Sequence, residues 1–146
     1  MTSIKDALND NGAGRNIFVK SWFAELDVWL DGKPVAYPAT DVLVSLSRLL
    51  VSAEGGLGTG FTYPHELKEN EKNTFDLMRS NFFAYAEFNK RYDESPEGTV
   101  TVTLVIEQLS DGREQATVEG FIEGGKVSKG ASDLKVSGKY GFVVIG

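Results

Sequence analysis

Two runs of alternating apolar residues in the last third of the chain constrain the fold more than any other feature of this sequence. The apolar positions are Val100, Val102, Leu104 and Ile106 in the first run and Ala116, Val118, Gly120 and Ile122 in the second. A period of two is typical of strands that bury one face of a sheet. We therefore predict two neighbouring strands, joined through "LSDGRE".

The connection between these runs determines how the two strands pair. A two-residue turn at Asp111-Gly112 would place Leu104 opposite Glu119, so that an apolar and a charged side chain would share a face. A three-residue loop over residues 110–112, with its glycine left-handed, places Leu104 opposite Val118 instead. We therefore predict the three-residue loop.

A second hairpin is predicted in "SWFAELDVWLDGKPVAYP", where apolar residues again alternate. Asp31-Gly32 supplies the two positive φ angles of a type I′ turn, which pairs Val28 with Val35. Pro34 has no N–H to donate to a ladder, so we expect the returning strand to be short and to lie at a sheet edge. The alternating positions are Trp22, Ala24, Leu26, Val28 and Leu30.

Between these hairpins the apolar spacing changes to that of helices. One helix is predicted over residues 40–54, because a strand would put Arg48 in the apolar row. A second is predicted over residues 74–92, with Asn73 as its N-terminal cap. The apolar positions are Val42, Leu46, Leu49 and Ala53 in the first, and Phe75, Met78, Phe82, Tyr85 and Tyr92 in the second.

The glycine-rich stretch "EGGLGTGFTYPHE" falls between the two predicted helices. Phe61 stands where a dinucleotide-binding motif needs its third glycine, and no Gly-Lys-Ser/Thr of a phosphate-binding loop follows. We therefore interpret residues 55–65 as a flexible connection that could also act as a lid over a pocket.

The element order ββ-αα-βββ, completed by an alternating run from Leu134 to Val144, favours an α+β fold. We predict a curved antiparallel sheet of about five strands packed against two helices. Residues 1–16 are polar and glycine-containing, and we predict a flexible N-terminal arm there. Residues 17–146 are predicted to form a single domain.

The composition argues against several classes of protein. The chain has no cysteine, which excludes disulfides and thiolate chemistry. Its net charge of −6 and its scattered basic residues argue against nucleic-acid binding, which depends on clustered Lys and Arg. No apolar run approaches the roughly 20 residues that span a bilayer. We expect a soluble, cytoplasmic protein without a membrane segment.

No pattern in the sequence predicts a catalytic residue, a metal site or a cofactor. His65 is the only histidine, and one histidine without cysteine does not make the usual zinc site. An enzyme that combines His65 with a carboxylate is the third hypothesis, behind two kinds of binding protein.

The predicted contact site lies on the polar side of the first strand, where Phe23, Glu25, Asp27 and Trp29 alternate. Large aromatics among acids on an exposed face are typical of a protein-contact patch. An ordinary solvated face is the alternative, and paired carboxylates that bind a cation or divide acid and base roles are another.

Two functions from different classes follow. The first is a non-enzymatic protein-binding or assembly module, either an inhibitor or immunity-type protein or a homo-oligomeric structural subunit. The alternative is a protein that binds a small hydrophobic ligand between the second helix and the sheet, in a pocket lined by Phe75, Phe82, Tyr85 and Phe88.

Overall fold

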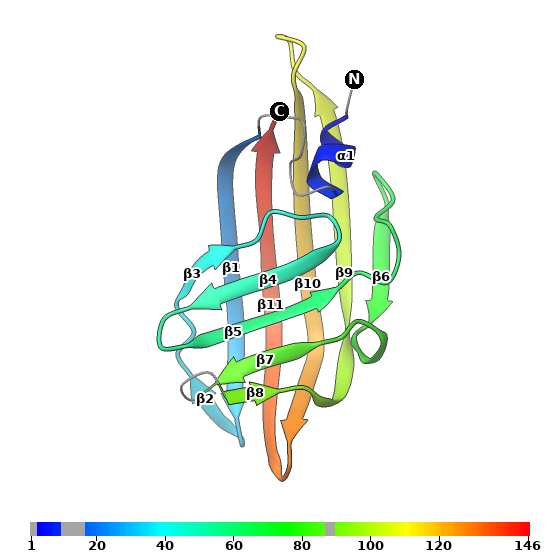
Figure 1. Cartoon of the computed structure of the whole chain (residues 1–146). Helices are drawn as coiled ribbons and strands as arrows, with labels where there is room; N and C mark the ends of the chain where they lie inside the picture. Colours follow the sequence, from blue (N-terminus) through cyan, green and yellow to red (C-terminus); the bar gives the residue numbers. More distant parts are fainter. Residues whose placement is uncertain (1–2, 10–16, 87–89) are drawn as a thin grey trace.

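The computed structural model describes residues 3–9, 17–86 and 90–146, which form two antiparallel sheets and one short helix (Figure 1). The six-stranded sheet has the order β2-β1-β11-β10-β9-β6, and the five-stranded sheet has the order β3-β4-β5-β7-β8. The strands of the first are β1 (Phe18–Leu30), β2 (Lys33–Val35), β6 (Lys72–Asp76), β9 (Glu94–Gln108), β10 (Glu114–Lys129) and β11 (Ser132–Ile145). Those of the second are β3 (Ala39–Val42), β4 (Arg48–Ala53), β5 (Leu57–Thr62), β7 (Phe83–Ala86) and β8 (Lys90–Tyr92).

The two sheets pack face to face with their strands crossing at a steep angle (Figure 1). Helix α1 (Ile4–Asn9) lies on the same side of the six-stranded sheet as the five-stranded sheet does, near the end that the latter leaves uncovered (Figure 1). Ile4, Ala7 and Leu8 of α1 are buried. The flexible arm over residues 1–16 stays a prediction, since residues 10–16 lie outside the described ranges.

The predicted α+β fold with two helices is wrong, because the described residues are mostly in β-strands and form one short α-helix. The first predicted helix, over residues 40–54, is replaced by β3 and β4. In β4, Leu49, Val51 and Ala53 are buried, whereas Arg48 and Ser52 are exposed. Arg48 thus lies in the row that points to solvent, and the apolar row is the neighbouring one. Five to six residues with apolar side chains on both faces fit a helical period as well as a strand period.

The second predicted helix, over residues 74–92, is also wrong. This segment contains β6, the 3₁₀ helix η1 (Leu77–Arg79), β7 and β8. Asn73 does not cap a helix: it is buried in β6, and its side-chain amide bonds the backbone of Lys68, Glu71 and Val102. The aromatic residues of this segment belong to several short elements: Phe75 to β6, Phe83 and Tyr85 to β7, and Tyr92 to β8.

The glycine-rich stretch is not a connection between helices but the hairpin of β4 and β5. Ala53 pairs with Leu57, and Gly55 and Gly56 in the turn have φ of 82° and 73°. These two left-handed glycines therefore close a β-turn between two strands. The following glycines, Gly58 and Gly60, lie inside β5.

The predicted registers of the long strands are confirmed. Leu104 pairs with Val118, and Gly112 of the three-residue loop has a φ of 87°. Val28 pairs with Val35 across the Asp31-Gly32 turn, whose two residues both have positive φ. Strand β2, which contains Pro34, has three residues and lies at the edge of the six-stranded sheet, as expected.

The core lies between the two sheets and includes a polar link. Tyr63, which follows β5, and Tyr140 of β11 are both buried, and their hydroxyls are 2.6 Å apart. The ring of Tyr140 occupies the space in which a side chain at Gly120 would lie. A residue with a Cβ at position 120 would therefore overlap the ring that carries this link.

Candidate functional site

The four residues of the predicted contact site lie on the outer face of the six-stranded sheet, the face that points away from the five-stranded sheet. On β1, Leu26 and Val28 are buried, whereas Glu25, Asp27 and Trp29 are exposed and Phe23 is half-buried. The alternation that predicted this arrangement holds along the strand. The four side chains follow one strand rather than converging on one point.

The neighbouring strands add residues to this face. Phe23 pairs with Gly141 and lies across it: a Cβ there would come within 2.6 Å of the Phe23 ring. Glu25 pairs with Lys139, and their Oε2 and Nζ atoms are 3.5 Å apart. Lys139 pairs in turn with Phe121, whose side chain is 45% exposed.

Sequence reasoning missed Phe121 as a member of this face. The signal was present, because Phe121 alternates with Val118, Gly120 and Ile122 of the buried row. The predicted register also pairs the two strands correctly. Phe121 joins Phe23 and Trp29 on this outer face, and we call these three residues the aromatic face.

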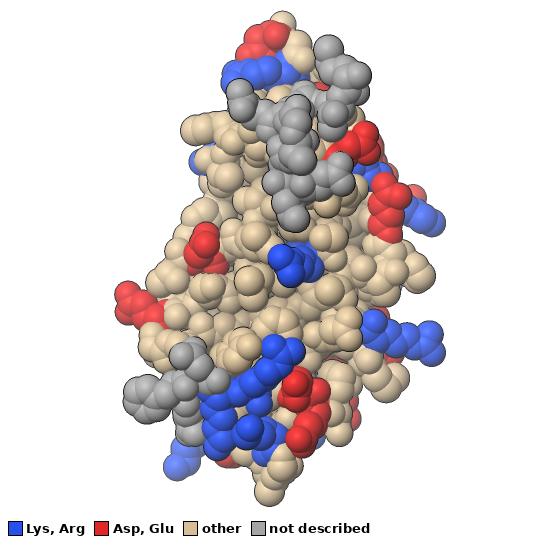
Figure 2. All heavy atoms as spheres, viewed as in Figure 1, with Lys and Arg blue, Asp and Glu red and all other residues tan. Residues whose placement is uncertain are grey.

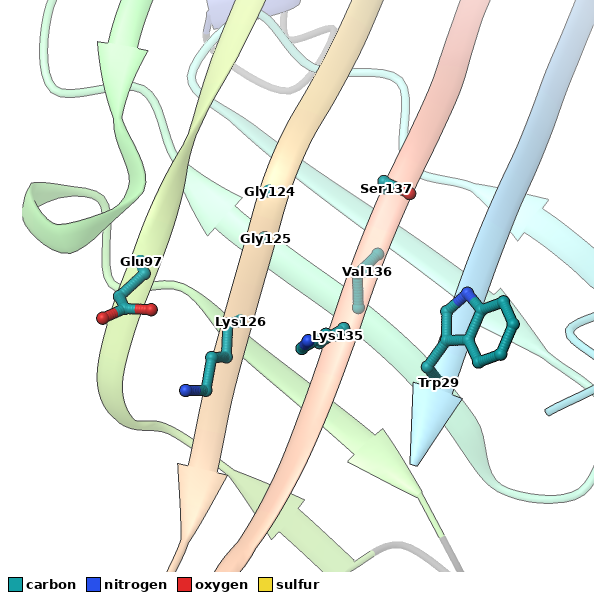
Figure 3. Close-up of a pocket in the computed structure, with 8 residues that line it drawn as sticks. All are labelled: Trp29, Glu97, Gly124, Gly125, Lys126, Lys135, Val136 and Ser137. Atoms are coloured by element: carbon teal, nitrogen blue, oxygen red, sulfur yellow. The ribbon is translucent and has the colours of Figure 1, made fainter. Parts of the chain in front are cut away.

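Shallow hollows open beside these aromatics. One, of about 420 Å³, lies among Phe23, Phe121, Thr101 and Thr103. Another, of about 460 Å³, lies beside Trp29 (Figure 3). Figure 3 shows Gly124 and Gly125 leaving bare backbone there, next to Lys126 and its neighbour Glu97 on β9. The outer face is therefore uneven, with rings standing beside places where the backbone is open.

Charges of both signs lie among the residues of the aromatic face. Trp29 pairs with Lys135, Lys135 with Lys126, and Lys126 with Glu97, so three charged residues beside Trp29 cross three strands. Glu25 and Asp27 lie on β1 itself, and both are exposed. Dividing acid and base roles between carboxylates requires burial of one of them, and the exposure of both does not provide it.

A third hollow, of about 520 Å³, lies beside Glu25 and Asp27 and is bordered by Tyr37. The Tyr37 hydroxyl is buried and has no hydrogen-bond partner among the described residues. Burial raises the pKa of Tyr37 well above its ordinary value. A hydroxyl in this situation weakens the fold unless something bonds it.

The predicted ligand pocket does not form as expected, because the helix that was to line it is absent. Phe75 and Phe82 are buried in the core, where Phe75 lies 5.8 Å from the ring of Tyr63. Tyr85 lies on the outer face of the five-stranded sheet, opposite Arg91. Phe88 lies outside the described residues. The structure does not bring Phe75, Phe82 and Tyr85 together around one cavity.

His65 is exposed, and its ring centre lies 6.2 Å from that of Phe75. In the described ranges, no three His, Cys, Asp or Glu side chains gather closely enough to hold a metal ion. Nor does any described helix have the length and apolar character needed to cross a bilayer.

In the described part of the chain, the fold is a two-sheet, antiparallel β protein whose six-stranded sheet presents the aromatic face on its outer side. Comparison of the chain with models of protein families, with curated proteins and with solved structures gave no match.

Proposed function

We propose that this chain is a protein-binding or assembly module that makes its contacts through the aromatic face. The observation that supports this most is the exposure of two large aromatics, Trp29 and Phe121, on the sheet face that also carries the half-buried Phe23. Trp29 and Phe121 are 43% and 45% exposed. Folding does not require aromatic side chains on a solvent-facing row, and aromatics are enriched in the contact cores of protein interfaces.

The surroundings of the aromatics fit the same function. Short side chains, Thr101 and Thr103, and the bare backbone at Gly124 leave hollows that a partner's side chains can fill. Charged residues such as Glu25, Asp27 and Lys139 lie between them. Protein interfaces combine apolar contacts with direct hydrogen bonds and polar groups.

The experiment that tests this compares Phe23→Ser, Trp29→Ser and Phe121→Ser with the wild-type chain. Met78→Ser is the matched control, because Met78 is 60% exposed but belongs to η1 rather than to this face. Sedimentation velocity over a range of concentrations reports self-association. Circular dichroism and thermal melting show whether each variant is folded.

If the chain is an assembly subunit, the wild type and the Met78 variant form the same discrete oligomer, and the aromatic variants dissociate. Loss of one central aromatic is expected to weaken association about 30-fold, equivalent to about 2 kcal/mol. An oligomer that survives all three substitutions would refute the assignment of this face. A wild type that is monomeric at every concentration would refute the assembly version, leaving binding to a different protein.

A further inference from the structure

A second candidate site lies on the opposite side of the molecule, on the outer face of the five-stranded sheet. A hollow of about 170 Å³ opens there between Arg48 of β4 and Arg91 of β8. We call it the arginine hollow; Leu50, Thr62, Asn81 and Phe83 also line it. Figure 2 shows this side of the molecule, where one basic group stands among uncharged side chains and a lower basic cluster stands beside acidic groups.

The glycines of β5 create the space for this hollow. Gly60 pairs with Leu50 on one side and with Phe83 on the other. A Cβ on Gly60 would come within 2.8 Å of both the Phe83 ring and the Leu49 carbonyl oxygen. The Phe83 ring therefore lies down across the strand at this position. The floor of the hollow is apolar, formed by Leu50 and Phe83.

Arg91 is held in place before any ligand binds. Its guanidinium carbon lies 4.4 Å from the centre of the Phe83 ring, a cation–π distance. Its Nη1 donates to the Tyr85 hydroxyl at 3.0 Å, and its Nε donates to Asp93 at 3.0 Å. These contacts fix the guanidinium, and no described residue bonds its Nη2. An arginine fixed in this way loses little further conformational entropy on binding.

The other rim of the hollow is polar. Arg48 pairs with Thr62 across β4 and β5. Asn81 donates to the Thr62 hydroxyl at 3.3 Å, and it has a left-handed backbone with φ of 51°. Among the residues that the structure describes, Arg48 has no carboxylate within ion-pair distance, whereas Arg91 has Asp93. The hollow thus has a net positive charge on a chain whose total charge is −6.

Two guanidinium groups beside an apolar floor match one class of ligand. Guanidinium groups bind carboxylate and phosphate oxygens with charge-assisted, often bidentate, hydrogen bonds. The apolar floor suits a ring or short chain attached to that group. Pockets for drug-sized ligands measure about 300–1,000 Å³, so a hollow of about 170 Å³ takes only a small molecule.

We propose that the arginine hollow binds a small organic anion: a carboxylate or phosphate carried by a single ring or a short apolar chain. Arg48 and Arg91 bind the oxyanion, and the apolar part lies on Phe83 and Leu50. This site is separate from the aromatic face, so either proposal can fail without the other.

The test is an NMR titration of ¹⁵N-labelled protein at low salt, following backbone amides and arginine Nε–H signals. Benzoate and phenyl phosphate are the two organic anions. Inorganic phosphate and benzyl alcohol carry only the charge and only the ring, respectively. Arg48→Gln tests the site, and Arg113→Gln is the matched control, because Arg113 is exposed and pairs with Asp111 in a distant turn.

We expect at least one organic anion to cause saturable shifts at Gly60, Thr62 and the Arg91 side chain. Arg48→Gln should weaken this binding by about tenfold or more, as loss of a charged hydrogen bond does. Arg113→Gln should leave it unchanged. Which of the two organic anions binds more tightly identifies the ligand as a carboxylate or a phosphate.

Three results would each overturn the proposal. The first is shifts that do not saturate up to the solubility limit of either organic anion. The second is equal binding in Arg48→Gln and wild type, because the site would then not use this arginine. The third is that inorganic phosphate or benzyl alcohol binds as tightly as both organic anions do. Either the apolar floor or the two arginines would then contribute nothing to binding.

Discussion

The buried link between Tyr63 and Tyr140 allows a quantitative test of how the two sheets are held together. The two hydroxyls are 2.6 Å apart, and both residues are buried. The ring of Phe61 packs edge-on against both tyrosine rings, with its centre 5.7 Å from that of Tyr63 and 6.2 Å from that of Tyr140. In the folded chain each hydroxyl bonds the other in place of water. Removing one hydroxyl therefore leaves the other buried without that partner.

The magnitude follows from this arrangement. Tyr140→Phe or Tyr63→Phe should lower the free energy of unfolding by about 1–3 kcal/mol, the cost of a buried polar group left unsatisfied. The double variant replaces both partners by apolar groups of the same shape and should lie within about 1 kcal/mol of the wild type. For a chain of this length, 1 kcal/mol corresponds to about 2–4 °C in Tm.

Urea unfolding of the four proteins, followed by tryptophan fluorescence, gives the double-mutant cycle. We expect the double variant to lose less free energy of unfolding than the sum of the losses in the two single variants. If the two losses simply add, the hydroxyls do not depend on each other and the reasoning is refuted.

The same pair predicts how stability depends on alkaline pH. Burial raises the pKa of Tyr63 and Tyr140 in the folded state above the unfolded value of about 10. Their contribution is therefore fully present below pH 10 and is lost as pH rises above it. Each tyrosine adds a slope of up to about 1.4 kcal/mol per pH unit. The double phenylalanine variant should lose stability less steeply than the wild type above pH 10.

Two further substitutions test the packing around the core. Gly120→Ala should lower the free energy of unfolding in urea by about 3 kcal/mol or more, because its Cβ would overlap the ring of Tyr140. A loss below about 1 kcal/mol, the size of a tolerated core change, would contradict this packing. Tyr37→Phe should leave the free energy of unfolding unchanged or raise it by up to about 1 kcal/mol, since it removes a buried hydroxyl without a partner among the described residues. A clear loss of stability would show that this hydroxyl is bonded.

The long strands could be predicted from sequence because their period is unambiguous. In β9 and β10 the apolar and polar rows alternate over many residues, so the three-residue loop could be chosen by register alone. The five-stranded sheet gave no such signal. Its strands have three to six residues, and in β4 both Leu49 and Leu50 are apolar although only Leu49 is buried to 2%. A helical period and a strand period fit so short a segment equally well.

The same difference explains which site residues could be found. The row of Phe23, Glu25, Asp27 and Trp29 belongs to one strand, so its alternation is visible in the sequence. The arginine hollow joins residues 48, 60, 83 and 91 through three strand pairings. Because each of those strands was assigned to a helix or a loop, no spacing in the sequence could bring Arg48 and Arg91 together.

One local arrangement occurs at three places in the described residues, once in the core and twice on an outer face. An aromatic ring lies across the glycine paired with it on the next strand at Tyr140 and Gly120, at Phe23 and Gly141, and at Phe83 and Gly60. The first pair is in the core, where it positions the hydroxyl that bonds Tyr63. The other two lie on outer faces. A ring that packs flat against the backbone there removes less apolar surface from water than it would in the core. A ring already fixed in one orientation loses less entropy when a partner or ligand binds, which is the property that both proposed sites require.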